Sequence, residues 1–124
     1  MRQKFVLAGL IASLLISAGC TAGSDNSKDL IVYSGRNKKL VSPILEQASK
    51  DLNLDIKVRY GKTSELTIAL LEEGENSKVD VFLGQDAGAL GTLEAKQRTQ
   101  PIPSEILDEV DSRFRSPTGN WIGV

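Results

Sequence analysis

Histidine is absent from the 124 residues of this chain, and cysteine occurs only once, at position 20. Without an imidazole the chain cannot build a histidine-based zinc site, a Ser-His-Asp triad or a histidine pH switch from its own residues. A single thiol cannot form an internal disulfide. The sequence therefore excludes these kinds of site within the chain itself.

Positive charge is not in excess either. The chain has 15 Lys and Arg against 16 Asp and Glu, so its formal net charge is -1. Proteins that bind nucleic acid usually need a basic face to neutralise phosphates, and we expect no nucleic-acid partner. The sequence also lacks a GxxxxGK[ST] run and a GxGxxG run after a strand, so it carries no nucleotide-binding motif.

No apolar run is long enough to span a membrane. The longest, Phe5 to Ile16, has roughly 12 residues, whereas a spanning helix needs about 20. It follows the basic residues Arg2 and Lys4 and ends in the small residues "SAGC", which is the layout of a secretory signal. We predict a signal peptide over residues 1–19.

Cys20 stands where such a signal would be cleaved. The arrangement resembles a bacterial lipobox, in which the cysteine is lipidated and becomes the first mature residue, although Ser17 stands where that motif usually has leucine. The alternative is a plain signal peptide that leaves an unpaired cysteine, but an exported free thiol is exposed to oxidation. We therefore expect an exported, membrane-anchored lipoprotein, with residues 20–29 as lipidated cysteine and flexible tether.

Strands and helices alternate after the tether. Three stretches have the β-branched, apolar or alternating character of strands: Leu30–Ser34, Asp55–Tyr60 and Val79–Leu83. A stretch of helical spacing follows each one, and this order is typical of a layered α/β domain with a parallel sheet. A short apolar stretch, Trp121–Val124, begins a further strand that nothing closes. We predict that residues 30–124 form the first part of an N-terminal α/β lobe, incomplete at its C-terminus.

The boundaries of the predicted helices rest on capping residues. Ser42 is the expected N-cap of the first helix, with Pro43 at its first position. Thr63 or Ser64 is expected to cap the second helix, which ends at Gly74. The acidic run Glu72–Glu75 is interpreted as a solvated helix end and turn.

Three loops follow the three strands, and ligands of open parallel sheets bind outside the carboxyl ends of the strands. The loops contain small polar residues and glycine, which leave backbone N–H groups accessible to an anion. The candidate ligand-binding residues are Ser34, Gly35, Arg36, Asn37, Thr63, Ser64, Gln85 and Asp86.

Each of these candidates also has a purely structural interpretation. The planar fork of Arg36 can grip a carboxylate, carbonate or phosphate with two hydrogen bonds, or it can form a surface ion pair. Thr63 and Ser64 taken singly are helix caps, and Asp86 is favoured as an N-cap over a metal ligand. Tyr33 can pack in its strand, or it can turn its hydroxyl towards a ligand and serve as a metal ligand.

Segments "YSGR", "RYG" and "QDAGALG", at these intervals within residues 30–124, resemble the N-terminal part of ferric-iron-binding lipoproteins of bacterial ABC transporters. The resemblance implies the periplasmic-binding-protein fold, in which two α/β lobes close on a ligand. Some relatives have a histidine where this chain has Asn37, and a glutamate where it has Gln85. The resemblance therefore implies Fe(III) bound with carbonate or a similar anion, with Arg36 and Ser34 on the anion and the tyrosine ligands beyond Val124.

The same resemblance implies an ABC permease and an ATPase as partners, a monomeric protein and no enzymatic activity. Two alternatives remain open at this point. One is a binding protein for another anionic solute, such as a phosphonate, a phosphate ester or a thiamine-like compound. The other, disfavoured because the sequence offers no nucleophile and base pair, is a fragment of an α/β hydrolase or transferase.

Overall fold

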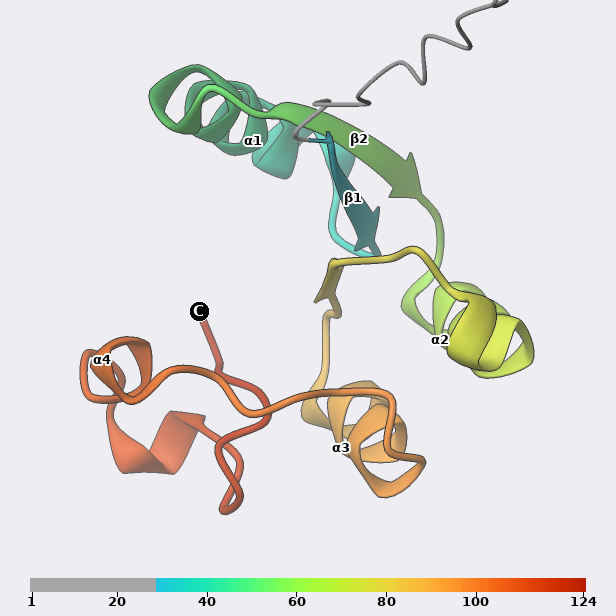
Figure 1. The fold of residues 1–124 in the computed structure, drawn as a ribbon, viewed down its shortest axis with the longest axis vertical. Coiled ribbons are helices and arrows are strands. Elements are labelled where there is room, and N and C mark those ends of the chain that lie inside the picture. Colours follow the sequence, from blue (N-terminus) through green and yellow to red (C-terminus); the bar gives the residue numbers. More distant parts are fainter. Residues whose placement is uncertain (1–28) are drawn as a thin grey trace, which may run out of the picture.

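A parallel sheet of three strands forms the centre of the computed structural model, which describes residues 29–124 (Figure 1). Strand β1 (Asp29–Ser34) lies between β2 (Asp55–Tyr60) and β3 (Val81–Leu83), and both neighbours run parallel to it. The predicted signal peptide and Cys20 lie outside the described residues. Strand β1 begins one residue before the predicted start at Leu30, because Asp29 already pairs with Asp55.

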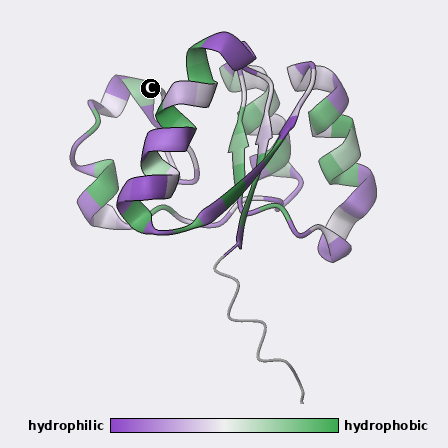
Figure 2. Cartoon of the chain, turned by 90° about the horizontal axis from the view of Figure 1, so that it is seen from above, coloured by the Kyte–Doolittle hydropathy of each residue, from purple (hydrophilic) through white to green (hydrophobic). Residues whose placement is uncertain are grey.

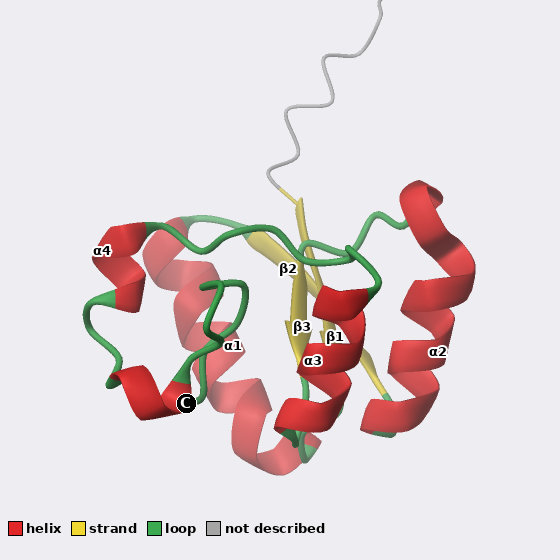
Figure 3. Cartoon of the chain, turned by 90° about the horizontal axis from the view of Figure 1, so that it is seen from below, coloured by secondary structure: helices red, strands yellow, loops and turns green. Residues whose placement is uncertain are grey.

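Helices cover both faces of this sheet. They are α1 (Lys38–Leu52), α2 (Thr63–Glu73), α3 (Ala87–Ala95), α4 (Ser104–Leu107) and the 3-10 helices η1 (Gly74–Asn76) and η2 (Ser112–Phe114). Helix α1 lies on one face and α2 and α3 lie on the other (Figures 1 and 3). The predicted α/β class with a parallel sheet is confirmed. Within the described part of the chain, no helix has the length and apolar character needed to cross a membrane.

The two faces of the sheet are packed unequally. Residues in register share a face, so Val32, Val58 and Val81 point to the side of α1. The opposite side, under α2 and α3, holds the hydrophobic core, which consists of Tyr33, Leu66, Leu70 and Leu93 with Ile31 and Phe82 packed against it. By contrast, α1 has no buried residue. The α1 side is therefore covered less completely than the other, although Val32 at its centre is buried.

The first helix begins earlier than predicted. Asn37 is its N-cap, with Oδ1 accepting a hydrogen bond from the Lys39 N–H at 2.9 Å, and Pro43 lies inside the helix. The prediction that Ser42 is the N-cap was wrong, because Asn37 satisfies a first-turn N–H one turn earlier. Ser42 instead donates to Glu46 Oε1 at 2.8 Å. Pro43 lacks the donor for the carbonyl four residues back and its ring crowds that carbonyl, yet the helix continues to Leu52.

Other boundaries shift less. Lys62, not Thr63 or Ser64, is the N-cap of α2, while Gly74 ends that helix as predicted. Strand β3 begins at Val81 rather than at residue 79. Just before it, the Asp80 N–H donates to the Ile31 carbonyl, but the Ile31 N–H donates to the Asp80 carboxylate and not to a backbone carbonyl. The last apolar stretch forms a single antiparallel bridge between Arg115 and Ile122 in place of a strand.

A polar network ties α2 to the sheet. The Tyr33 hydroxyl donates to Glu73 Oε1 at 2.7 Å and accepts from Arg59 at 3.1 Å, while the Ser77 hydroxyl donates to Glu73 Oε2 at 2.7 Å. These bonds from Ser77 and Tyr33, together with the charge of Arg59, hold the pKa of Glu73 below its ordinary value. The interpretation of the acidic run as merely solvated was therefore wrong for Glu73.

This network makes stability depend on pH in a defined direction. Because the pKa of Glu73 is lower in the folded state, its contribution is present above the ordinary value of 4.5 and is lost as pH falls through the folded value. The Glu73→Gln variant should therefore be less stable than the wild type at neutral pH, and the difference should shrink below about pH 4. Urea unfolding of both proteins between pH 3 and 7 measures this.

The exposed neighbour Glu72 provides the matched control, since Glu72→Gln leaves the bonds to Tyr33 and Ser77 intact. A gap between wild type and Glu73→Gln that stays constant over the whole pH range would contradict the assignment.

Candidate functional site

The three loops that follow the strands meet at one edge of the sheet. The Gly35 N–H, at the end of β1, donates to the Leu83 carbonyl of β3 at 2.8 Å. On the other side, the Gly61 N–H donates to the Ser34 carbonyl at 3.2 Å. Because β1 is the central strand, its loop is the one that contacts both of the others. The edge therefore has the position expected of a ligand site in an open parallel sheet.

Gln85 and Thr63 join the loops further. The Gln85 side-chain amide donates to the Gly35 carbonyl at 2.7 Å, and its backbone N–H donates to Thr63 Oγ1 at 3.2 Å. Each bond links residues that are more than twenty positions apart in the sequence. Gln85 therefore holds the third loop against both others, and Thr63 serves as a loop acceptor instead of a helix cap.

Gly35 is the point of closest approach between these loops. A Cβ atom at this position would lie 2.1 Å from Thr63 Oγ1 and 2.9 Å from the Thr63 Cα atom. Ser34 beside it is fully buried, and its hydroxyl accepts a hydrogen bond from the Arg36 N–H at 3.3 Å. Only glycine fits here, because the clash would involve backbone as well as a short side chain.

Arg36 projects from this packed region into solvent. Its side chain is exposed, and within residues 29–124 it forms no hydrogen bond or ion pair. The alternative of a surface ion pair is therefore not observed among the described residues. The guanidinium keeps all of its donors available for an anion at the edge.

The remaining candidates divide into caps and open positions. Asn37 caps α1 through its side chain, and Asp86 caps α3 by accepting from the Ala89 N–H at 2.8 Å. The N-cap interpretation of Asp86 is confirmed. Ser64 is exposed in the first turn of α2, whose N-cap residue Lys62 makes no side-chain capping bond. No side-chain cap therefore satisfies the first N–H groups of α2, and the acidic group of its first turn is Glu65.

Tyr33 does not belong to this edge. Its hydroxyl bonds Glu73, the last residue of α2, whereas the edge holds the first residue, Thr63. A helix of 11 residues separates its ends by about 15 Å at 1.5 Å per residue. The packing interpretation accounts for Tyr33, because its ring lies in the core and both hydroxyl bonds are internal. In the described part of the chain, no group of three or more acidic, histidine or cysteine side chains could hold a metal ion.

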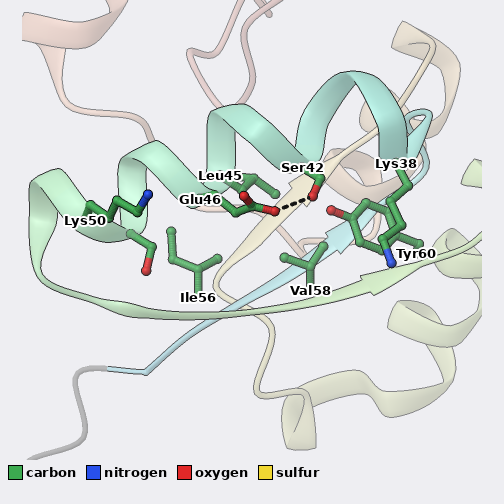
Figure 4. Close-up of a pocket in the computed structure, with 9 residues that line it drawn as sticks. Lys38, Ser42, Leu45, Glu46, Lys50, Ile56, Val58 and Tyr60 are labelled. Carbon is green, nitrogen blue, oxygen red and sulfur yellow. Dashed lines mark hydrogen bonds between the residues drawn. The ribbon is translucent and has the colours of Figure 1, made fainter.

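A cavity of about 430 Å³ lies elsewhere, between α1 and β2 (Figure 4). Its floor is the half-buried face of β2 formed by Ile56, Val58 and Tyr60, and the Lys38 Nζ atom lies 5.5 Å from the centre of the Tyr60 ring. None of the predicted site residues lines it. The strict alternation of apolar and polar residues in β2 is the sequence signal for this apolar floor. The cavity itself depends on the distance between α1 and β2, which the sequence pattern does not give.

No protein-family model matches the chain. A search of curated proteins finds the "Fe(3+)-binding periplasmic protein" of Serratia marcescens, which is 28% identical over 118 residues. That match covers 95% of this chain and 35% of the relative. The chain therefore spans about a third of the length of this relative.

A search of solved structures also finds iron-binding proteins that the chain matches over part of their length. Iron-bound HitA from Pseudomonas aeruginosa superimposes with a TM-score of 0.75 at 24% identity, over 77% of this chain and 31% of that one. A Trichodesmium protein in complex with iron and citrate has a TM-score of 0.71 at 30% identity, over 77% of this chain and 30% of that one. The homologues of the chain are thus named as ferric-iron-binding periplasmic proteins, and they confirm its fold.

Gly35 supplies the test of the loop edge. Gly35→Ala should destabilise the protein by about 2 kcal/mol, the usual cost of overpacking a tight contact, because the new methyl group overlaps Thr63. Urea unfolding measures the loss, and amide exchange should show faster exchange at the Gln85 N–H.

Gly91 is the matched control, because it lies in α3 and a Cβ there would meet nothing within 4 Å. Gly91→Ala should stabilise the helix by about 0.5–1 kcal/mol. Equal effects of the two substitutions would show that the approach of Gly35 to Thr63 does not hold the loops.

Proposed function

We propose that this chain is the amino-terminal part of an exported protein that captures ferric iron outside the cytoplasm for an ABC uptake system. Residues 1–19 act as the signal peptide, Cys20 carries the lipid anchor, the following residues form a tether, and residues 30–124 form the first part of a ligand-binding lobe. The matched proteins support the iron assignment, since they are named for ferric iron binding or contain iron in their structures.

The observation that carries the proposal is the unpaired guanidinium of Arg36 at the meeting point of three loops. The Arg36 side chain is exposed, its backbone is tied down through Ser34, and the uncapped start of α2 approaches the same edge at Gly35. A planar, fully charged donor fork next to free helix N–H groups matches a carboxylate or carbonate. We therefore assign the edge to an anion that binds together with iron.

Ferric iron is a hard cation and prefers charged oxygen ligands. In the arrangement proposed here, Arg36 and Ser64 bind carbonate or a similar anion. The Ser34 hydroxyl, which the resemblance placed on the anion, is instead fully buried under the edge and accepts from the Arg36 N–H. Four other candidates position the loops rather than touch the metal, because their polar atoms already have partners. Gln85 and Thr63 form the bonds between loops. Asn37 and Asp86 cap helices. The tyrosine ligands implied by the resemblance belong to the part of the protein that this chain does not span.

Capture requires no bond-making chemistry. The proposed protein closes two lobes on the metal and its anion, and a membrane permease with its ATPase supplies the energy for transport. We expect a monomer without enzymatic activity. None of the proteins matched above is named for a phosphonate, a phosphate ester or a thiamine-like compound.

Arg36→Ala tests the anion site directly. Removal of a charged hydrogen-bonding fork costs about 1.5–3 kcal/mol, so anion binding should weaken by about tenfold or more. The binding of bicarbonate and of ferric citrate to the full chain can be measured by calorimetry. The same variant can be placed in a chimera in which this chain replaces the matched region of the Serratia marcescens protein, with visible absorbance reporting iron.

Arg98→Ala is the matched control, because Arg98 is an exposed arginine outside the loop edge and its side chain has no hydrogen bond or ion pair within residues 29–124. It removes the same charge and should leave binding unchanged. If both variants weakened anion binding equally, Arg36 would act only through its positive charge. An unchanged affinity in Arg36→Ala would contradict the proposed anion site.

Cys20→Ala tests the lipid anchor separately from the ligand. Because lipidation of the thiol is the proposed attachment, the variant should no longer incorporate labelled palmitate and should move from the membrane fraction to the soluble extracytoplasmic fraction. Ser17→Leu restores the usual lipobox residue and should retain the label. Labelling that persists in Cys20→Ala would contradict the assignment of the anchor to this residue.

A further inference from the structure

The cavity between α1 and β2 is not used by the proposed iron and anion site, and its lining differs from that of the loop edge. Its floor is the row Ile56, Val58 and Tyr60, all half-buried, and Leu45 adds an apolar side chain from α1. With about 430 Å³, it falls in the range of roughly 300–1,000 Å³ that small-molecule sites occupy. The cavity therefore offers an apolar surface of suitable size that solvent still reaches.

The cavity is elongated. Along β2, the floor from Ile56 to Tyr60 is about 13 Å long at 3.3 Å per residue. Along α1, the lining residues run from Lys38 to Lys50, a distance of about 18 Å at 1.5 Å per residue. Figure 4 shows these two lysines at opposite ends of the cavity, with Ile56 and Val58 between them. A ligand that fills this space is longer than it is wide.

Two donor groups meet at the Lys38 end. The Lys38 Nζ atom lies 5.5 Å from the centre of the Tyr60 ring, in a cation–π contact. Among residues 29–124, the Lys38 ammonium forms no ion pair and the Tyr60 hydroxyl forms no hydrogen bond. Both groups can therefore donate to a ligand, and together they suit an anion such as a carboxylate.

The rest of the helix wall does not offer an equivalent anion position. Glu46 lies between the two lysines, where it accepts from the Ser42 hydroxyl at 2.8 Å, and its charge repels a carboxylate. Lys50 stands in the last turn of α1, where its charge complements the negative end of the helix dipole. Hydrophobic and hydrophilic bands alternate along α1, the helix nearest the viewer in Figure 2. The anionic group of a ligand is thus favoured at Lys38.

The site is local to one helix and one strand, which are consecutive in the chain. All nine residues that line it belong to α1 and β2, and Arg36 and Ser64 are not among them. No polar side chain interrupts the floor between Ile56 and Tyr60, so the body of the ligand is apolar. We propose that the cavity binds an elongated carboxylate with an apolar body, such as a medium-chain fatty acid. Its carboxylate lies at Lys38 and Tyr60, and its chain lies over Val58.

Calorimetric titration of the full chain with hexanoate and decanoate tests the proposal. The affinity should rise about two- to fourfold for each added methylene, because the longer chain covers more of the apolar floor. Decyltrimethylammonium has the same body with a cationic head and should bind about tenfold more weakly than decanoate. Equal affinities for the two heads, or an affinity that does not depend on chain length, would overturn the proposal.

Two substitutions place the carboxylate. Lys38→Ala removes the cation and should weaken decanoate binding about three- to tenfold. Tyr60→Phe keeps the ring and removes only the hydroxyl, so the loss should be about threefold. Lys39→Ala is the matched control, because Lys39 is an exposed lysine in the same turn of α1 that does not line the cavity. Equal losses in Lys38→Ala and Lys39→Ala would contradict the position of the carboxylate.

Arg36→Ala separates this site from the loop edge. Since Arg36 does not line the cavity, the variant should bind decanoate as the wild type does, whatever its effect on bicarbonate. If Arg36→Ala weakened decanoate binding as much as Lys38→Ala, decanoate would occupy the loop edge and the separate site would be refuted.

Val58→Thr probes the floor, because it replaces one methyl group by a hydroxyl group of similar size. It should reduce the gain in affinity from hexanoate to decanoate, and an unchanged gain would show that the chain does not lie over Val58. Thermal unfolding of each variant checks that it is folded.

Discussion

The close approach of Gly35 to Thr63 is the constraint on which the rest of the loop edge depends. Parallel strands bring the three loops to one side of the sheet, but they do not by themselves join them. Because Gly35 has no side chain, its backbone reaches Thr63 closely enough for the Gln85 amide to bond the Gly35 carbonyl. The edge is thereby held by backbone and by short side chains, and Arg36 is presented from a rigid base.

The hydrophobic core and the candidate ligand edge lie on different parts of the sheet. The core lies under α2 and α3, where Tyr33 combines ring packing with bonds to Glu73 and Arg59. The loop edge uses the opposite end of α2. One helix therefore contributes its amino end to the candidate site and its carboxyl end to the network that ties it to the sheet. This arrangement leaves the charged groups of the network away from the loop edge.

Sequence patterns identified the strands well and the helix starts poorly. The strand over Asp55–Tyr60 has the predicted bounds, because its period of two is set by the pleat itself. The start of α1 was misplaced, since both Asn37 and Ser42 can cap a helix and Pro43 favours the second. The choice between two such caps depends on how the loop leaves β1. The bonds of Glu73 were missed for the same kind of reason, as its partner Tyr33 lies forty positions away.

What the sequence determined by itself is the order of strands and helices, the parallel α/β class and the three loops that could meet a ligand. These follow from local periodicity and from glycine and proline, which act over a few residues. Tertiary structure alone decided that Gln85 and Thr63 tie the loops while Arg36 stays unpaired, and that Tyr33 belongs to the core. Those outcomes depend on contacts between residues far apart in the chain, because a polar side chain takes whichever partner the fold brings within reach.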